Sequence, residues 1–128
     1  MRILVETISH ESQRYKTVGD WRFEGDNLEI KVSNLGNIYY EWFIAEHEIN
    51  EALMCKKDGI TEKQVSDYDI AFEQLRKEYP EIIGDQEPGD MVSAPYNSQH
   101  KRATQIEYSS VSLHGENWAE YEKAVNKL

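Results

Sequence analysis

The chain has 128 residues, and its 14 Lys and Arg against 24 Asp and Glu give a net charge of −10 at neutral pH. Hydrophobic residues make up 39% and aromatic residues 11%, which is too apolar for a disordered acidic tail. The deficit of Lys and Arg argues against direct binding to nucleic-acid phosphates or to an anionic membrane surface. The length predicts one domain with a core of its own.

Cysteine usage and hydropathy bear on where the protein works. A single cysteine, Cys55, excludes an internal disulfide and is typical of a reducing compartment. No apolar run approaches the roughly 18–20 residues of a membrane span, and Glu6 comes too early for a signal peptide. We therefore expect a cytoplasmic protein with no membrane association.

The first 35 residues have the pattern of β-strands. Residues 2–8 are rich in β-branched and apolar side chains, and residues 14–18 form a second candidate strand. Apolar and polar side chains alternate in residues 21–23 and 28–32, and residues 24–27 between them have the composition of a turn. This pattern predicts an antiparallel hairpin with one buried face.

The pattern becomes helical from residue 38. Residues 38–57 contain no Gly or Pro, and Gly59 follows as a stop signal for the helix. Thr61 and Gln64 fit a capping box at the start of a second helix, which we expect to run to about Tyr79.

The last part of the chain begins with a long connection. Residues 80–95 contain all three prolines and are expected to form a loop. Ser93 is a candidate cap for a third helix that runs to about Leu113, and a short amphipathic helix closes the chain. The sequence therefore predicts a single α+β domain, with a small antiparallel sheet in residues 1–35 packed against about four helices in residues 38–128.

The residues most informative about function lie in the helix 38–57. At about 100° per residue, His47 and Glu51 fall together on an otherwise apolar face, and the opposite face is also apolar. A helix that is apolar on two faces is covered on both sides, so we expect His47 and Glu51 to be buried. A buried carboxylate is costly unless it is paired or coordinates a metal. Glu51 therefore needs a partner.

The spacing of these residues favours a metal ion as that partner. Side chains four residues apart meet on a helix, so His47 and Glu51 could hold one ion. Glu48 lies about a quarter turn from His47 and could act as a general base on a bound water. His100, on the inward face of the third helix, is the first choice for a third ligand. Alternatively, His47 and Glu51 form a structural hydrogen bond without an ion, and His100 is a core histidine.

Other acidic residues could support these ligands or hold a second ion. Asp69 and Glu73 are four residues apart on the second helix, and Glu107 lies on the inward face of the third. Glu87 and Asp90 in the long loop could lie over the same pocket. The plainer alternatives are that Asp69 and Glu73 balance Lys or Arg side chains on the helix surface, and that Glu87 and Asp90 belong to an ordinary turn.

The segment His47-Glu48-Ile49-Asn50-Glu51 resembles the metal-binding helix of zincin metallopeptidases, which has the pattern H-E-x-x-H. In that family the two histidines bind zinc and the glutamate between them activates water. The resemblance implies that His47 is a ligand, that Glu48 is the base, and that Glu51 takes the place of the second histidine. Zinc is the first choice of metal, and because a carboxylate stands in place of the second histidine, manganese and iron are alternatives.

The whole chain also resembles small phage or prophage proteins of unassigned function, which have a histidine–glutamate helix and a downstream Glu-Pro-Gly-Asp loop, here residues 87–90. This second resemblance implies a phage-encoded protein that works in the host cytoplasm.

Two functions follow from these patterns and remain open. One is a small metal-dependent hydrolase, peptidase-like by resemblance, in which His47, Glu51 and His100 hold one divalent ion and Glu48 activates its water. The other is a non-catalytic counter-defence protein of phage type that captures a small signalling molecule or a host protein. The charge of −10 suits a basic partner surface. A bound ion could also only stabilise the fold. The oligomeric state does not follow from the sequence.

Overall fold

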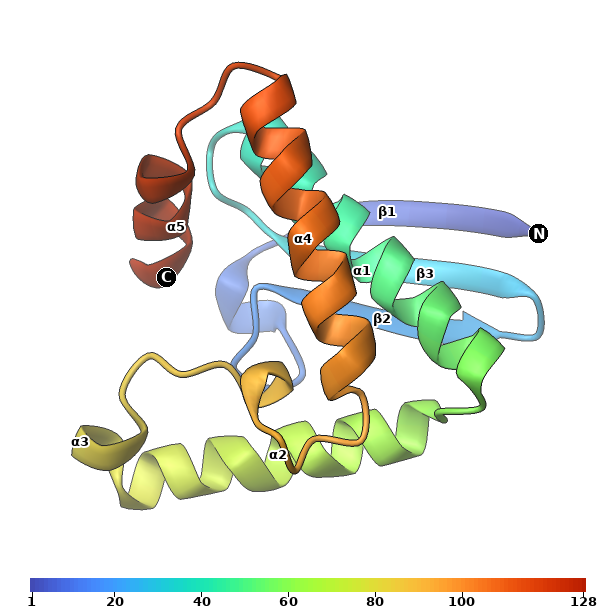
Figure 1. Cartoon of the computed structure of the whole chain (residues 1–128), viewed down its shortest axis with the longest axis vertical. Coiled ribbons are helices and arrows are strands. Elements are labelled where there is room, and N and C mark those ends of the chain that lie inside the picture. Colours follow the sequence, from blue (N-terminus) through green and yellow to red (C-terminus); the bar gives the residue numbers. More distant parts are fainter.

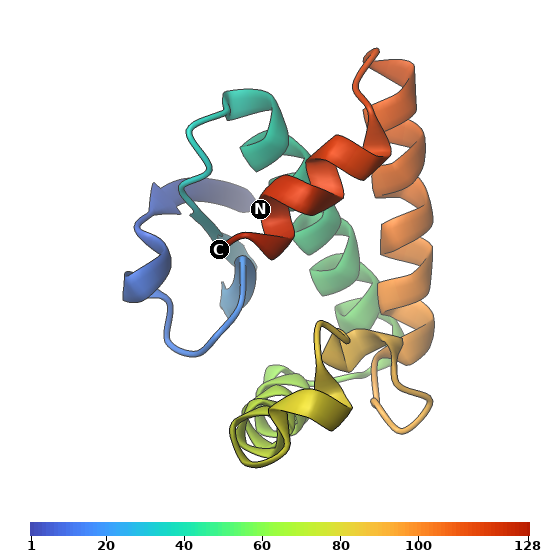
Figure 2. The same ribbon diagram turned by 90° about the vertical axis from the view of Figure 1, so that its left-hand side faces the viewer.

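The structure is a computed structural model that describes residues 1–128, in which helices lie on one face of a three-stranded sheet (Figure 1). The strands are β1 (Arg2–Ile8), β2 (Gly19–Glu24) and β3 (Asn27–Ser33). The helices are α1 (Ile38–Asp58), α2 (Glu62–Glu78), α3 (Pro80–Ile83), α4 (Asn97–Leu113) and α5 (Trp118–Asn126). Figure 2 shows the sheet, α1 and α4 one after another, as three successive layers. The predicted α+β class is confirmed. None of the helices combines the length and the apolarity that crossing a membrane requires.

The sheet has the order β1-β3-β2, so β3 is its central strand. β2 and β3 form the predicted antiparallel hairpin, with Trp21 opposite Ile30 and a turn at Gly25, whose φ of 61° suits glycine. β1 pairs with β3 in the parallel direction, so the sheet is mixed and not antiparallel throughout as expected. Sequence alternation identifies a strand but not its direction, which depends on the connection between strands.

The prediction of a strand at residues 14–18 is wrong. This segment instead links a short 3₁₀ turn (His10–Ser12) to β2. Arg14 donates two hydrogen bonds to Asp20, and the Tyr15 hydroxyl donates one to Asp69. These side-chain contacts hold the segment in place, together with one backbone hydrogen bond that the Ser33 amide of β3 donates to the Val18 carbonyl.

The core lies between the sheet and α1. Leu28, Ile30 and Val32 of β3 are fully buried, as is Phe43 of α1. Full burial of each such side chain stabilises the fold by roughly 1.5–3 kcal/mol relative to an exposed position. The sheet and α4 cover the two faces of α1 over most of its length, as the two apolar faces of its sequence predict, and Ile38 and Trp42 near its start stay exposed.

The ends of the first two helices follow their local signals. The Asn37 side chain accepts hydrogen bonds from two backbone amides of the first turn of α1, and Gly59 ends that helix in the left-handed conformation. Thr61 and Gln64 form both hydrogen bonds of the predicted capping box at the start of α2.

The segment 80–95 is more structured than the expected loop. It contains the one-turn helix α3 and a 3₁₀ turn at Pro88–Asp90. α4 begins at Asn97 and not after Ser93, because the Ser93 hydroxyl lies 2.6 Å from the Tyr68 hydroxyl on α2 instead of capping α4.

Helices α1 and α4 lie side by side and antiparallel, which positions the candidate site (Figures 1 and 2). Ser110 near the end of α4 donates to Glu46, and Gln99 near its start donates to Asp58. Ala103 lies between these contacts and is 0% exposed. A small residue there allows the two helices to approach closely.

We predict that Ala103→Leu destabilises the protein by about 1–3 kcal/mol, because a larger side chain overpacks the contact between α1 and α4. Urea unfolding measures the change, and Ala71→Leu on the exposed face of α2 is the matched control. An A103L protein as stable as the wild type would show that the two helices are not closely packed at this position.

Candidate metal centre

Three side chains from α1 and α4 meet in the interior of the protein. His47 and Glu51 lie one turn apart on α1, and His100 lies in the first turn of α4. They are 7%, 5% and 7% exposed, respectively. The burial predicted for His47 and Glu51 from the helical pattern is confirmed, and the antiparallel packing of α4 brings His100 to the same place.

The two imidazole rings approach a single oxygen atom. His47 Nε2 lies 3.1 Å from Glu51 Oε2, and His100 Nδ1 lies 2.9 Å from the same oxygen. Two ligand atoms bound to one tetrahedral zinc ion are about 3.3 Å apart, given zinc–ligand distances of about 2.0–2.1 Å. The three side chains could therefore hold one ion with small movements, and their ligand atoms all lie within 4.8 Å of one another.

The other oxygen of Glu51 is held from the sheet. Trp21 on β2 donates its indole N–H to Glu51 Oε1 at 3.0 Å, and the bond is buried. This hydrogen bond fixes the carboxylate and leaves Oε2 directed at the two imidazoles.

The outer nitrogen of each imidazole faces carboxylates. His47 Nδ1 lies 2.8 Å from Glu107 Oε1, and Glu107 Oε2 accepts a hydrogen bond from Tyr121. His100 Nε2 lies 3.1 Å from Glu87 and 3.2 Å from Asp90. A histidine that binds a metal through one nitrogen commonly donates the other N–H to a carboxylate, which fixes the ring.

These outer contacts are close but poorly directed. The buried nitrogens His47 Nδ1 and His100 Nε2 have no hydrogen bond of good geometry. Buried polar atoms are rarely left in this state without a functional or chemical reason. Both are the outer nitrogens of their rings, so an ion between His47 Nε2, His100 Nδ1 and Glu51 would leave them to the surrounding carboxylates.

The acidic neighbours make both histidines basic. Burial lowers the pKa of His47, but Glu107 and Glu51 outweigh it and hold the pKa well above its ordinary value. Burial also lowers the pKa of His100, but Asp90, Glu51 and Glu87 outweigh burial and raise the pKa to about 12. A metal ion must displace these protons, so its binding competes with protonation.

Glu51 remains ionised in this setting. Burial raises its pKa, but hydrogen bonds from His100 and His47 outweigh burial and lower the pKa to about 2. Glu51 therefore keeps its buried negative charge, which the two protonated histidines balance and which a divalent cation would meet once it displaced their protons.

Glu48 lies beside the cluster without a partner. Its carboxyl group forms no hydrogen bond or ion pair in the chain, and it lies so close to β2 that a Cβ at Gly19 would be 2.7 Å from Glu48 Oε1. Burial, followed by the charge of Glu51, raises the pKa of Glu48 well above its ordinary value. Glu48 lines the same cavity as His47 and Glu51, so its carboxyl group is available to a bound molecule.

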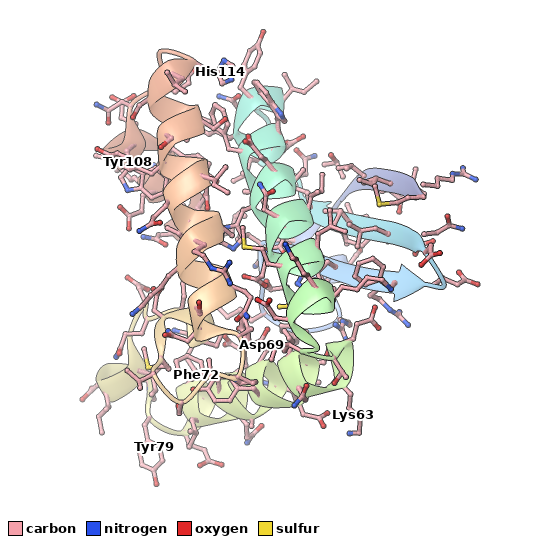
Figure 3. All side chains as sticks on the ribbon, turned by 45° about the vertical axis from the view of Figure 1, so that its right-hand side comes forward. Lys63, Asp69, Phe72, Tyr79, Tyr108 and His114 are labelled. Carbon is pink, nitrogen blue, oxygen red and sulfur yellow. The ribbon has the colours of Figure 1, made fainter.

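The acidic residues of α2 do not join the histidines. Asp69 accepts hydrogen bonds from Tyr15 and Tyr96 beneath the adjoining ends of α1 and α4 (Figure 3). Glu73 pairs with Arg76 at 2.8 Å. A second ion held by Asp69 and Glu73 together with the histidines is therefore not supported. Asp69 instead accepts a hydrogen bond from Tyr96, whose ring centroid lies 6.1 Å from that of His100.

A cavity of about 200 Å³ opens onto these residues. It is lined by Glu48, Glu51 and both histidines, and carboxylates outnumber Lys and Arg among its other lining residues. This excess of negative charge favours a cation in the cavity.

Two residues of the site do not follow from sequence patterns. Trp21 and Tyr121 are spaced like core aromatic residues, and both are indeed almost fully buried. The indole N–H of Trp21 contacts Glu51, and the hydroxyl of Tyr121 contacts Glu107. The one available signal is that a buried Trp N–H or Tyr hydroxyl needs a hydrogen-bond partner.

Comparisons of the chain with protein-family models, with curated proteins and with solved structures found no significant match. The candidate site is therefore interpreted from its own geometry and chemistry.

We predict that Gly89→Ala disturbs His100, because a Cβ at position 89 would overlap the imidazole ring. Overpacking of this kind costs about 1–3 kcal/mol, and the ring must move away from Glu51. The NMR signals of the His100 ring report the movement, with Val92→Ala, which is 91% exposed on the same connection, as the control. Unchanged His100 signals in G89A would contradict the close approach.

We predict that Asp69 makes stability fall as pH rises from about 4 to about 7. Burial raises the pKa of Asp69 from 3.8 to about 7, despite hydrogen bonds from both tyrosines. The native state then keeps a proton that the unfolded chain releases, so this contribution is present below about pH 4 and is lost as pH rises through about 7. Urea unfolding at several pH values should show a smaller fall in Asp69→Asn than in the wild type.

Asp67→Asn is the matched control for this pH dependence, because the Asp67 side chain is 62% exposed on the same helix. Equal pH dependence in D69N and the wild type would show that Asp69 is already ionised at acidic pH.

Proposed function

We propose that the protein is a small metal-dependent hydrolase in which His47, Glu51 and His100 hold one divalent ion next to Glu48. The observation that carries this proposal is the approach of His47 Nε2 and His100 Nδ1 to the single oxygen Glu51 Oε2, at 3.1 and 2.9 Å, in a buried position. The outer contacts of all three side chains support it.

The chemistry of these residues fits a catalytic ion. Two imidazoles and one carboxylate leave a coordination position open for water, as in catalytic zinc sites with three protein ligands. Zinc is the first choice. Manganese and iron also accept this mixture of nitrogen and oxygen ligands. When bound, such an ion would supply an activated water and polarise the carbonyl group of a substrate.

Glu48 is the proposed general base. It lies on the same helix as two of the ligands, lines the cavity and has no partner within the chain. As a carboxylate it can accept a proton from the attacking water, and as a carboxylic acid it can return that proton to the leaving group. The resemblance of residues 47–51 to the zincin helix implies the same role.

The remaining residues hold the ligands in place. Glu107, itself held by Tyr121, orients the His47 ring, and Glu87 with Asp90 orients the His100 ring. Trp21 fixes Glu51. A cavity of about 200 Å³ suits a small amide or ester, or the end of a peptide, better than a long polypeptide.

We predict that the purified protein contains about one divalent ion per chain, and that His47→Ala loses it. Elemental analysis by mass spectrometry measures both. The control is His114→Ala, which removes an exposed histidine at the opposite end of α4 from His100. If the wild type contains no ion even after incubation with zinc, manganese or iron salts, the metal centre and the hydrolase are both wrong.

We predict that Glu48→Gln keeps the ion but lowers hydrolysis by about 10²–10⁴-fold, because the amide cannot accept the proton. The measurement is the release of a fluorescent amine or alcohol from a set of small amides and esters. The control is Glu122→Gln on the exposed face of α5. An ion-containing wild type without hydrolytic activity on the set would favour a structural ion in a binding protein of the counter-defence type.

A further inference from the structure

Strand β1 is an unprotected edge of the sheet. It lies at one side of the order β1-β3-β2, as Figure 1 shows, and six of its seven residues are exposed. Ile3, Leu4 and Val5 are 37%, 43% and 44% exposed, and the strand contains no Pro or Lys. Proteins usually protect a long apolar edge strand, because its free backbone groups can pair with another strand.

The free backbone groups of β1 can be assigned to particular residues. The Asn34 amide donates to the Ile8 carbonyl, so the groups of Ile8 point toward β3. Backbone groups alternate in direction along a strand. The even-numbered residues of β1 therefore pair with β3, and the odd-numbered residues from 3 to 7 direct their N–H and C=O groups away from the sheet.

We infer that two copies of this chain form a dimer with two-fold symmetry, in which their β1 strands pair antiparallel about Leu4. In this register Leu4 faces Leu4 of the second copy, and Ile3 faces Val5 of the second copy. The outward groups of Ile3 and Val5 are the ones that an antiparallel pair of residues exchanges. The three-stranded sheet of each copy then continues into that of the other.

The charges of the strand favour a second copy over an unrelated strand. In the same register Arg2 faces Glu6 of the second copy, and symmetry repeats this pair on the other side of Leu4. Arg2 forms no ion pair within its own chain, whereas Glu6 contacts Lys31 of β3. Opposite charges directly across two strands stabilise the pairing, and each contact occurs twice in a two-fold interface.

An apolar groove beside β1 exposes further surface that a second copy would cover. α1 packs on β2 and β3, so the groove between β1 and α1 is left open. It is lined by Val5, Ile38 and Trp42, of which Ile38 is 73% exposed and Trp42 44%. A second copy that continues the sheet at β1 places its own β1 and α1 beside this groove and removes apolar surface from water. The inference does not depend on the metal centre.

Sedimentation equilibrium tests the dimer and its charge pairs. The wild type should be a dimer, and Arg2→Glu should raise its dissociation constant at least about tenfold, because it places two acidic side chains opposite each other. R2E combined with Glu6→Arg should restore the dimer. Lys123→Glu, an equal charge change on exposed α5, should have no effect.

Disulfide formation tests the register. The Cα atoms of a facing pair without mutual hydrogen bonds are about 4.5 Å apart, which is within the range for a disulfide. Leu4→Cys should therefore form a covalent dimer under mild oxidation much faster than Val5→Cys, which does not face itself. The native Cys55 is 0% exposed and should not take part. A wild type that stays monomeric up to about 100 µM, or an L4C that reacts no faster than V5C, would overturn the inference.

Discussion

The structure depends on one buried carboxylate, that of Glu51. An ionised carboxyl group in the interior costs several kcal/mol unless hydrogen bonds and opposite charges compensate for it. The compensating groups come from three elements: Trp21 from β2, His47 from α1 and His100 from α4. The packing of the sheet and of α4 against α1 therefore brings together the groups that compensate for the burial of Glu51. The same arrangement brings two imidazoles to one oxygen.

The acidic residues around the histidines have two effects, and both favour the binding of a cation. Glu107, Glu87 and Asp90 lie within 3.2 Å of the outer ring nitrogens, and they also contribute to the excess of negative charge in the cavity. Without an ion, protons bound to the imidazoles balance this charge. An ion would displace these protons and be held by the imidazoles, whose outer nitrogens would still face the carboxylates. Glu48 forms no hydrogen bond or ion pair within the chain, and for this reason the proposed mechanism assigns proton transfer to it.

Local signals in the sequence predict most of the helical part. The caps at Thr61 and Gly59 and the two-faced pattern of α1 depend on neighbours within a few residues, so they are confirmed, as is the burial of Glu51. The parallel direction of β1 and the placement of Trp21 and Tyr121 depend on contacts between distant segments. Amino-acid patterns carry little information on these, because an aromatic residue whose polar atom reaches a site has the same spacing as any core aromatic residue.

The most direct test of the metal centre is a crystal structure of the protein grown with one equivalent of zinc, with diffraction data collected on both sides of the zinc absorption edge. The account predicts one anomalous peak at about 2.0–2.2 Å from His47 Nε2, His100 Nδ1 and a Glu51 oxygen. A peak elsewhere, or no peak while His47 and His100 still contact Glu51 directly, would contradict it.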